Sequence, residues 1–407
     1  MADTQNSSRR GPLDGIKVLD FSRILSGPYA SMVLADLGAE VIKVEPISGG
    51  DDTRNFPPFQ NGLSHYYIAL NRNKQSISLD LKSPEGIDIA KRLAAKCDIL
   101  IENFRPGVME RLGLGHESLR AENEKLIYCS ITGFGNDSPH SDKPAFDIVV
   151  QALSGVMHLN REPDQPPNRL SLPLGDMAGS IFSMFGILAA LHERSVTGRG
   201  SRVEIPMLDS LIAMLGYLSQ IYFISGKSPQ PVGTRHPSIV PYGSFPTSDG
   251  YVIVACLTDR FWQNFAKCLG RPEWLSDIRF SLYENRLANR DQLEAMIFER
   301  MREDSTAYWL AQLTEYDVPH APILDVAEAL DQEHVTRRGL IETVHHDKVG
   351  DLKLVKSPMR FDGSGPQAAR APSLLGENSG SVLSRELGLQ QGEIEALIAK
   401  GVVNIGG

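Results

Sequence analysis

Short apolar runs alternate with longer amphipathic stretches over the first third of the chain. The apolar runs at 16–21, 40–44, 77–81, 98–102 and 126–131 predict strands, and the stretches at 28–37 and 84–96 predict helices between them. Parallel strands need crossover connections of this kind, and continuous apolar runs are typical of strands that are buried on both faces. The pattern therefore predicts an α/β fold with a Rossmann-like, doubly wound parallel sheet.

The pattern changes after this region. From 146 to about 225 it predicts three long apolar helices. Beyond Gly226, two short apolar runs flank the segment 246–250, whose Pro, Asp and Gly predict a hairpin, and helices are expected near 259–269, 290–303 and 307–316. We therefore predict a large domain at 1–225, a smaller α+β domain at 226–335, and a final segment at 336–407 with strand-like pieces and short helices.

Composition narrows the class of protein. The 407-residue chain carries a net charge of -9, which argues against a nucleic-acid or anionic-membrane partner. Its four cysteines form no paired motif and its histidines have no ligand spacing, so we expect neither a disulfide framework nor a metal site. Residues 1–10 lack the apolar core of a signal peptide, and the most apolar stretch, 211–224, is interrupted and too short to span a bilayer. We expect a cytoplasmic enzyme.

One acidic residue, Asp176, stands between Gly175 and Gly179 at the start of an apolar segment that is rich in small residues. A carboxylate there would meet the positive end of a helix dipole and unpaired backbone N–H groups. It is therefore either a helix cap or a nucleophile that attacks an activated carbonyl, with glycines leaving room for the substrate. The residues alone leave both roles open.

Two further clusters follow predicted strands. The segment 25–28 links the first strand to the first helix, where open parallel sheets bind ligands, although a plain turn explains it as well. The basic residues at 72, 74, 82, 105 and 111, together with Phe104, would suit a nucleotide phosphate and base, or would be ordinary solvated charge. No glycine fingerprint follows the first strand and no serine elbow is present, which disfavours a dehydrogenase and a serine hydrolase.

Taken in order along the chain, these pieces resemble the class III CoA-transferases, the group of the formyl-CoA and carnitine CoA-transferases. The resemblance covers about 13–403 and rests on a series of short motifs. They are Pro12 to Phe21, Leu37 to Glu45, Gly50-Asp51-Asp52-Thr53-Arg54, Asn71-x-Asn73-Lys74, Glu102-Asn103-Phe104-Arg105-Pro106-Gly107, Gly175-Asp176, Thr197-Gly198-x-Gly200 and Leu374-Leu375-Gly376-Glu377. Each motif alone is weak, but their order is specific.

The resemblance implies a mechanism, a site and an assembly. Asp176 takes the position of the catalytic aspartate, which attacks the thioester and carries CoA through anhydride and thioester intermediates. No prosthetic group is implied, because CoA is itself a substrate. The implied CoA contacts are Leu25, Ser26, Leu79, Asp80, Lys82, Asn103, Phe104, Arg105, Arg111, Ala145, Phe146 and Asp147. The implied assembly is an interlocked homodimer, in which both chain ends, including 336–407, build the large domain.

Departures from the family pattern bear on the substrate. Leu25 replaces the glutamine that formyl-CoA transferases carry beside the thioester, and their glycine-rich flap is absent. Instead, 233–242 resembles the loop of succinyl-CoA-dependent dicarboxylate transferases, in which Arg235 and His236 would pair with a distal carboxylate or would simply be exposed loop residues. We therefore expect succinyl-CoA as the donor and glutarate, itaconate, mesaconate or malate as the acceptor, rather than formate or oxalate.

Two alternatives remain on the sequence. An α-methylacyl-CoA racemase would need two acid–base groups, one of them a histidine where Phe146 stands, and an aromatic ring cannot move a proton. A non-catalytic acyl-CoA-binding protein would tolerate the loss of the Asp176 carboxylate. The sequence favours transfer over both.

Overall fold

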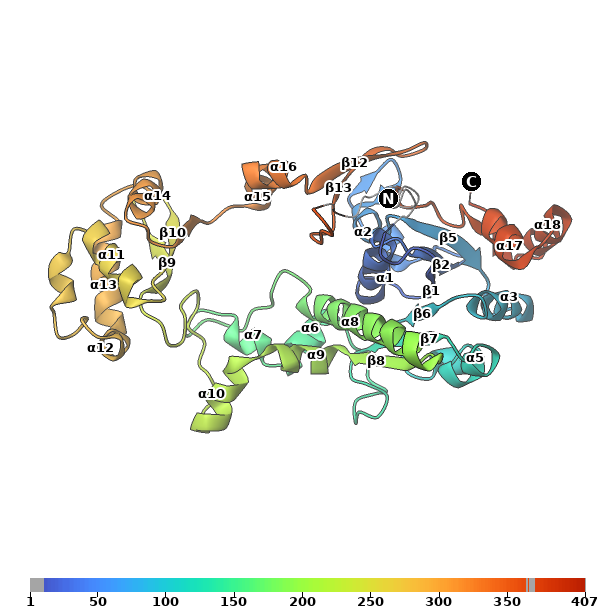
Figure 1. Ribbon diagram of the computed structural model, residues 1–407, viewed down its shortest axis with the longest axis horizontal. Helices are drawn as coiled ribbons and strands as arrows, with labels where there is room; N and C mark the ends of the chain where they lie inside the picture. The colour runs from blue at the N-terminus through green and yellow to red at the C-terminus, as the bar shows by residue number, and fades with distance from the viewer. Residues whose placement is uncertain (1–10, 364, 366–369, 407) are drawn as a thin grey trace, which may run out of the picture. The chain divides into compact units, whose positions relative to one another are not determined.

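The computed structural model describes residues 11–363, 365 and 370–406, which form two compact units (Figure 1). The first unit takes the chain up to 154, 170–215 and from 336 onward, and the second takes 155–169 and 216–335. The division at 335 lies at the predicted boundary, but 155–169 and 216–225 belong to the second unit. There Arg161 O accepts the N–H of Gly233, and Tyr217 stacks on His236. Residues 1–10, to which the signal-peptide expectation refers, lie outside the described residues.

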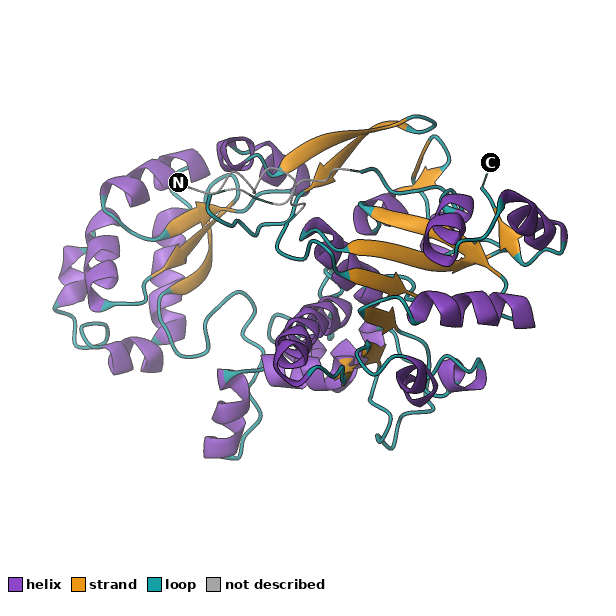
Figure 2. Ribbon diagram, turned by 45° about the vertical axis from the view of Figure 1, so that its right-hand side comes forward, coloured by secondary structure: helices purple, strands orange, loops and turns teal. Residues whose placement is uncertain are grey.

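The first unit is built on a seven-stranded sheet in the order β14-β5-β2-β1-β6-β7-β8 (Figure 2). Its strands are β1 (Lys17–Asp20), β2 (Glu40–Pro46), β5 (Lys74–Leu79), β6 (Ile99–Glu102), β7 (Ile127–Thr132), β8 (Arg202–Pro206) and β14 (Val403–Asn404). Neighbouring strands are parallel, except that β14 is antiparallel to β5. The chain extends the sheet from β1 toward β5 and then, with β6, in the other direction. The predicted parallel α/β sheet is confirmed, and this reversal opens a crevice at the carboxyl ends of β1 and β6.

The strands β1, β2, β5, β6 and β7 are buried on both faces, which explains their continuous apolar runs. Side chains alternate across each strand, so that in β1 Val18 lies on one face and Leu19 on the other. The face of Val18 packs against α1 (Ser26–Asp36), α6 (Asp147–Leu153), α8 (Leu174–Thr197) and α9 (Met207–Met214). The face of Leu19 packs against α3 (Pro84–Ala94), α4 (Val108–Arg111), α5 (His116–Glu122), α17 (Ser379–Leu387) and α18 (Gln391–Ala399).

The last part of the chain returns to the first unit. Val403 pairs with Leu79, and Asn378 Oδ1 accepts the N–H of Ser76 at 3.0 Å, so the returning segment completes the edge beyond β5. The remaining elements of this unit are the 3₁₀ turn η1 (Asp52–Asn55), β3 (Phe59–Gln60), β4 (Leu63–Ser64), α2 (His65–Leu70), β12 (Ile341–His346) and β13 (Gly350–Val355). The helix α16 (Glu333–Arg338) spans the division between the units.

The second unit has a separate core around Trp262, Phe265 and Trp309. The hairpin expected around 246–250 is formed by β9 (Tyr242–Pro246) and β10 (Tyr251–Ala255), and β11 (His320–Pro322) pairs antiparallel with β10. The three expected helices are α11 (Asp259–Cys268), α13 (Arg290–Met301) and α14 (Thr306–Glu315). The other elements are α7 (Val156–Leu159), α10 (Tyr217–Ser225), η2 (Pro272–Leu275), α12 (Tyr283–Ala288) and α15 (Val326–Asp331).

The helix α8 is long and apolar enough to cross a membrane by length and composition alone, with a mean hydropathy of 1.6. The sequence analysis considered 211–224 instead, which the structure divides between α9 and α10. One side of α8 carries Ala178, Ile187 and Ala190, which are buried against the sheet and α1. The hydropathy of α8 is therefore explained in part by its place in the core of the first unit.

Candidate active site

A pocket lies at the carboxyl ends of β1, β6 and β7, in the crevice where the strand order reverses. It brings together five separate segments of the first unit. They are the loop after β1 (Ile24, Ser26), the loop after β6 (Asn103, Phe104, Arg105, Pro106), the end of β7 with the loop that follows (131–135, Ser141, 143–147), Asp176 of α8, and Met207 of α9. Eight of the predicted site residues line this pocket: Ser26, Asn103, Phe104, Arg105, Ala145, Phe146, Asp147 and Asp176.

Asp176 lies inside the first turn of α8, not in front of the helix. The helix begins at Leu174, so the expectation that it starts after Asp176 is wrong. The N-terminal N–H group of Gly175 is bound by Asp147 Oδ1 at 2.7 Å, so Asp147 has taken the capping role that the sequence offered to Asp176. Within the described residues, the Asp176 carboxylate accepts no hydrogen bond, and it remains available to a ligand in the pocket.

The electrostatic surroundings of Asp176 disfavour its charge. Burial raises the pKa of its carboxyl, and the nearby Asp147 carboxylate raises it further, to about 7. Both effects oppose ionisation, and no cation is among the causes. A carboxylate that titrates near neutrality in a pocket is a candidate catalytic group.

The glycines of α8 serve packing rather than substrate access. A Cβ on Gly175 would lie 2.5 Å from Val150 Cγ2, and one on Gly186 would lie 2.5 Å from Val203 Cγ1. A Cβ on Gly179 would be less crowded, at 3.2 Å from Met207 Cγ and 3.3 Å from Ile131 Cγ2. The expectation that these glycines leave room for the substrate is therefore wrong for their side-chain positions, because their open faces are filled by α6, β7 and β8.

The segment after β1 is tied to the other walls of the pocket. Asn103 Nδ2 donates to Arg23 O at 2.8 Å and lies 3.2 Å from Ser26 Oγ, while Asn103 Oδ1 accepts the N–H of Arg23. Ser180 Oγ donates to Ser26 O at 2.6 Å and lies 2.8 Å from the main-chain oxygen of Asp176, one turn earlier on α8. Asn103 and Ser180 therefore fix Ser26 relative to Asp176.

The other predicted CoA contacts, Leu25, Leu79, Asp80, Lys82 and Arg111, do not line this pocket. Leu25 is buried beneath the segment, and Leu79 is fully buried where β5 pairs with β14. Asp80 and Lys82 follow the end of β5, where Asp80 Oδ1 accepts the N–H of Lys82. Arg111 is exposed at the end of α4. Its Nη1 atom would lie 3.0 Å from a Cβ added to Gly107, which follows the loop residues Phe104 and Arg105.

Arg235 and His236 belong to the second unit. Arg235 Nη1 lies 3.4 Å from Glu294 Oε2 and 3.7 Å from Asp291 Oδ1, so its charge is already partly compensated. His236 Nδ1 accepts the N–H groups of Ser238 and Ile239, which places the proton of the neutral ring on Nε2. The ring therefore has one N–H donor that is not used by the loop itself.

Some residues of the site escaped the sequence analysis. Burial and the charges of Asp176 and Asp147 raise the pKa of Tyr66, so this phenol on α2 lies within electrostatic reach of the candidate nucleophile. Lys143 contributes a cation to the pocket lining. Ser180 carries no motif, and its contact with Ser26 spans 154 positions of the sequence. Gly133 also lines the pocket, where a Cβ would lie 2.1 Å from Ala145 Cβ, and the glycine-rich strand end 132–135 is its local signal in the sequence.

Several known proteins resemble this chain in sequence and fold. The sequence model of CoA-transferase family III matches residues 13–379. A succinyl-CoA:glutarate CoA-transferase from Mus musculus is 37% identical over 96% of this chain and 90% of that protein. An acetyl-CoA:oxalate CoA-transferase from Acetobacter aceti is 36% identical over 95% of this chain and 98% of that protein. A CAIB/BAIF family protein from Brucella suis has a crystal structure with a TM-score of 0.83 and 36% identity, covering 93% of this chain and 100% of that one.

The chain belongs to CoA-transferase family III, and the protein is a CoA-transferase. The resemblance on which the sequence analysis relied is thereby confirmed. Both named relatives are transferases, which favours CoA transfer over the racemase and the non-catalytic binding protein.

Proposed function

We propose that the protein transfers CoA from succinyl-CoA to a short-chain dicarboxylate, with Asp176 as the nucleophile. The observation that carries this proposal is the Asp176 carboxylate in the pocket at the strand reversal, which accepts no hydrogen bond from the described residues and has a pKa of about 7. The name of the mouse relative supports the donor and the acceptor class.

The proposed reaction passes CoA through Asp176 in balanced steps. The carboxylate attacks the thioester carbonyl of succinyl-CoA, the C–S bond breaks, and the products are a succinyl–aspartyl anhydride and CoA thiolate. The thiolate attacks the aspartyl carbonyl, which releases succinate and leaves an aspartyl-CoA thioester. The acceptor carboxylate displaces the thiolate from Asp176, and the thiolate then attacks the acceptor carbonyl of the new anhydride. Acceptor-CoA leaves and the Asp176 carboxylate is restored.

The pocket would hold the CoA substrate by its two ends. Ser26 and Leu25 would lie beside the thioester, next to Asp176. The guanidinium groups of Arg105 and Arg111 suit the phosphates, and the Phe104 ring suits a stacked base. The loop of 145–147 would cover the CoA, as the family resemblance implies.

The acceptor is proposed to be a C4 or C5 dicarboxylate: glutarate, itaconate, mesaconate or malate. Arg235 and the Nε2–H group of His236 are the proposed donors to its distal carboxylate. The Acetobacter aceti relative is named for oxalate and acetyl-CoA, so the expectation against oxalate has no support from that comparison. Oxalate therefore belongs in the test panel.

The experiment is mass spectrometry of the thioesters formed from succinyl-CoA and a panel of acids. The panel contains glutarate, itaconate, mesaconate, malate, oxalate and formate, and Asp176→Ala is the matched control. We expect a new acyl-CoA with a C4 or C5 acid and none in the control, because the variant has no carboxylate to attack the thioester. Turnover by Asp176→Ala would refute the nucleophile. Exchange only with oxalate or formate would refute the acceptor class. Scrambled stereochemistry of a 2-methylacyl-CoA without transfer would indicate the racemase.

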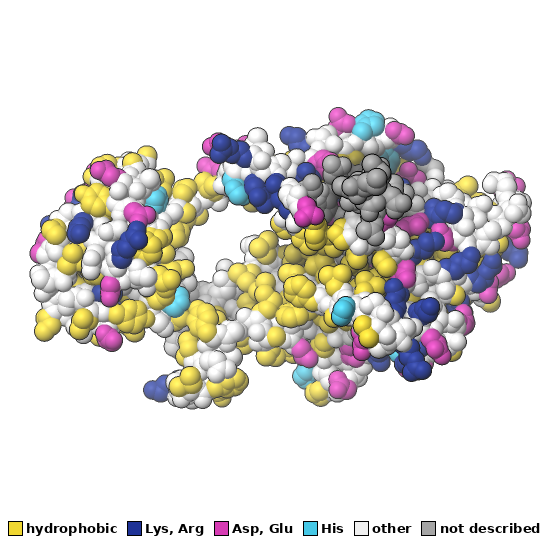
Figure 3. Space-filling view, viewed as in Figure 1, with side chains coloured by type: hydrophobic (Ala, Val, Ile, Leu, Met, Phe, Trp, Pro, Cys, Tyr) yellow, Lys and Arg dark blue, Asp and Glu magenta, His cyan; other side chains and the backbone are white. Residues whose placement is uncertain are grey.

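We further propose that the protein is a homodimer, as the family resemblance implies. The helix α8 supports an interface, since its outer side exposes Ile181, Phe185 and Leu188, with Phe185 62% accessible in the single chain. Figure 3 shows hydrophobic side chains gathered over this part of the first unit.

A further inference from the structure

The segment 22–26 adopts an unusual backbone where it enters the pocket. Ile24 has a φ of 66°, in the left-handed region. A β-branched side chain is rarely found there, because its Cβ crowds the backbone, and such a conformation persists only when the surroundings impose it. The residue lines the pocket itself, two positions before Ser26.

Hydrogen bonds from several elements impose this conformation. Lys43 Nζ donates to Ser22 O at 2.7 Å, and Asn103 binds both backbone groups of Arg23. The N–H of Ile24 is bound by Asp51 Oδ1 at 3.2 Å. At the end of the segment, Ser180 Oγ donates a hydrogen bond to Ser26 O. Asp51 is therefore the group that engages the strained residue directly.

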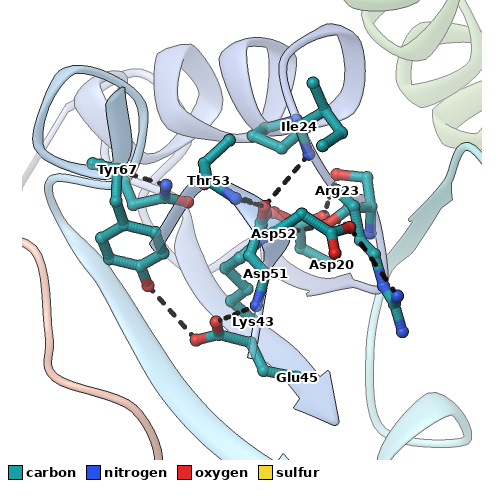
Figure 4. Close-up of polar contacts among 12 residues, drawn as sticks. Asp20, Arg23, Ile24, Lys43, Glu45, Asp51, Asp52, Thr53 and Tyr67 are labelled. Carbon is teal, nitrogen blue, oxygen red and sulfur yellow. Dashed lines mark hydrogen bonds and ion pairs between the residues drawn. The ribbon is translucent and has the colours of Figure 1, made fainter. Parts of the chain in front are cut away.

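Asp51 and Lys43 are both fully buried, and they form an ion pair with 2.9 Å between Oδ2 and Nζ (Figure 4). Thr53 adds its N–H at 3.0 Å and its hydroxyl at 2.8 Å to Asp51 Oδ1. Burial alone would raise the pKa of Asp51, but the Lys43 ammonium and the Thr53 donors outweigh it and hold the pKa at about 2. The carboxylate is thus ionised and fixed at any pH at which the enzyme works.

A buried ion pair of this kind needs an explanation, because apolar side chains of similar size stabilise a core at least as well. Here the pair spans β2 and the loop before η1, and its two members bind Ser22 and Ile24 on the same short segment. Figure 4 shows Asp51 between Ile24 and Lys43. The pair is therefore placed to define the geometry of the pocket wall.

We infer that Asp51 is a positioning residue for CoA transfer: by binding the N–H of Ile24, it holds this residue left-handed and thereby sets Leu25 and Ser26 against the thioester beside Asp176. This inference rests on the proposed function, since it names what aligns the substrate with the nucleophile. It assigns Asp51 no contact with substrate.

The test is a double-mutant cycle between Asp51 and Ile24. We expect Asp51→Ala to lower kcat about tenfold or more, with a much smaller change in the KM for succinyl-CoA, because misplacement of reacting groups acts on the rate. Asparagine tolerates the left-handed region far better than isoleucine. In an Ile24→Asn background, Asp51→Ala should therefore lower kcat about threefold or less. If the single variant does not fold, Lys43→Met/Asp51→Ala removes both charges together and replaces it in the cycle.

The matched control is the buried ion pair of Asp36 with Arg72, whose atoms approach to 2.6 Å at the opposite end of α1 from Ser26. Asp36→Ala, or Asp36→Asn if that variant does not fold, should lower the melting temperature but leave kcat within about twofold. The inference would be overturned if the substitutions at Asp51 and Asp36 lowered kcat equally. It would also be overturned if Asp51→Ala lowered kcat by the same factor in the Ile24 enzyme and in the Ile24→Asn enzyme. Asp176→Ala runs in the same series: turnover there refutes the nucleophile, whatever the cycle shows, and an inactive Asp176→Ala with a null cycle refutes the positioning role alone.

Discussion

At the scale of the residue, the defining feature of the site is that the Asp176 carboxylate accepts no hydrogen bond from the described residues. Asp147 binds the N–H of Gly175 in the first turn of α8, and its charge also opposes ionisation of Asp176. Since the nucleophile must be ionised, the enzyme should lose activity as the pH falls through about 7. Asp147 therefore binds the start of α8 and, together with burial, raises the pH range in which Asp176 is ionised.

Asp147→Asn separates these two roles. Asparagine keeps an oxygen for the Gly175 N–H but carries no charge, so the pKa of Asp176 should fall while burial still keeps it above its ordinary value. The acidic limb of kcat/KM should move to lower pH. A shift of about half a unit would raise the rate at pH 6, relative to its plateau, about two- to threefold. The measurement is a pH profile of kcat/KM for succinyl-CoA. Asp142→Asn, which alters an exposed carboxylate of the preceding loop, is the control and should leave the limb in place. An unmoved limb in Asp147→Asn would contradict the assigned electrostatics.

The sequence predicted individual residues of the site better than their contacts. Asn103, Phe104, Arg105 and Asp176 follow from motifs, and the structure brings them to one pocket. The cap on Gly175 comes from a residue 28 positions away, and the Ser180 contact depends on how α8 packs against the start of α1. No local pattern encodes such contacts. The left-handed conformation of Ile24 could not be predicted either, because its β-branched side chain favours an extended backbone.

At the scale of the element, apolar runs predicted most strands of the parallel sheet, but two predictions were wrong for physical reasons. The start of α8 was placed too late, because Asp is a preferred cap and Pro173, which the structure puts at the N-cap, was not considered. The strand β8 was missed inside a region predicted to be helical. Its alternation of Arg202, Val203, Glu204 and Ile205 is the period of an edge strand, but it is short and only half-buried.

At the scale of the whole molecule, order along the sheet explains the position of the site. The reversal between β1 and β6 puts the loops after these strands beside each other, and the Ser26 and Asn103 segments are those two loops. The return of the chain end to β5 could be stated only from the family resemblance, since two residues of β14 carry too little pattern to predict a pairing.

Assembly is the whole-molecule prediction. We expect sedimentation equilibrium to give twice the 44.7 kDa of one chain, because the exposed apolar side chains of α8 are stabilised when a second copy covers them. The same samples should be assayed for CoA transfer across the concentration range. A fully active species of 44.7 kDa would contradict the homodimer.

The most direct measurement of the central claim is detection of CoA on Asp176. The enzyme is mixed with succinyl-CoA without acceptor, quenched, treated with borohydride to convert an aspartyl thioester into the stable alcohol, digested, and mapped by mass spectrometry. The proposed mechanism predicts a reduced side chain at Asp176, its disappearance when an acceptor acid is added before the quench, and no such product in Asp176→Ala. Reduction at another carboxylate, such as Asp147, or turnover with an unmodified Asp176, would contradict the account.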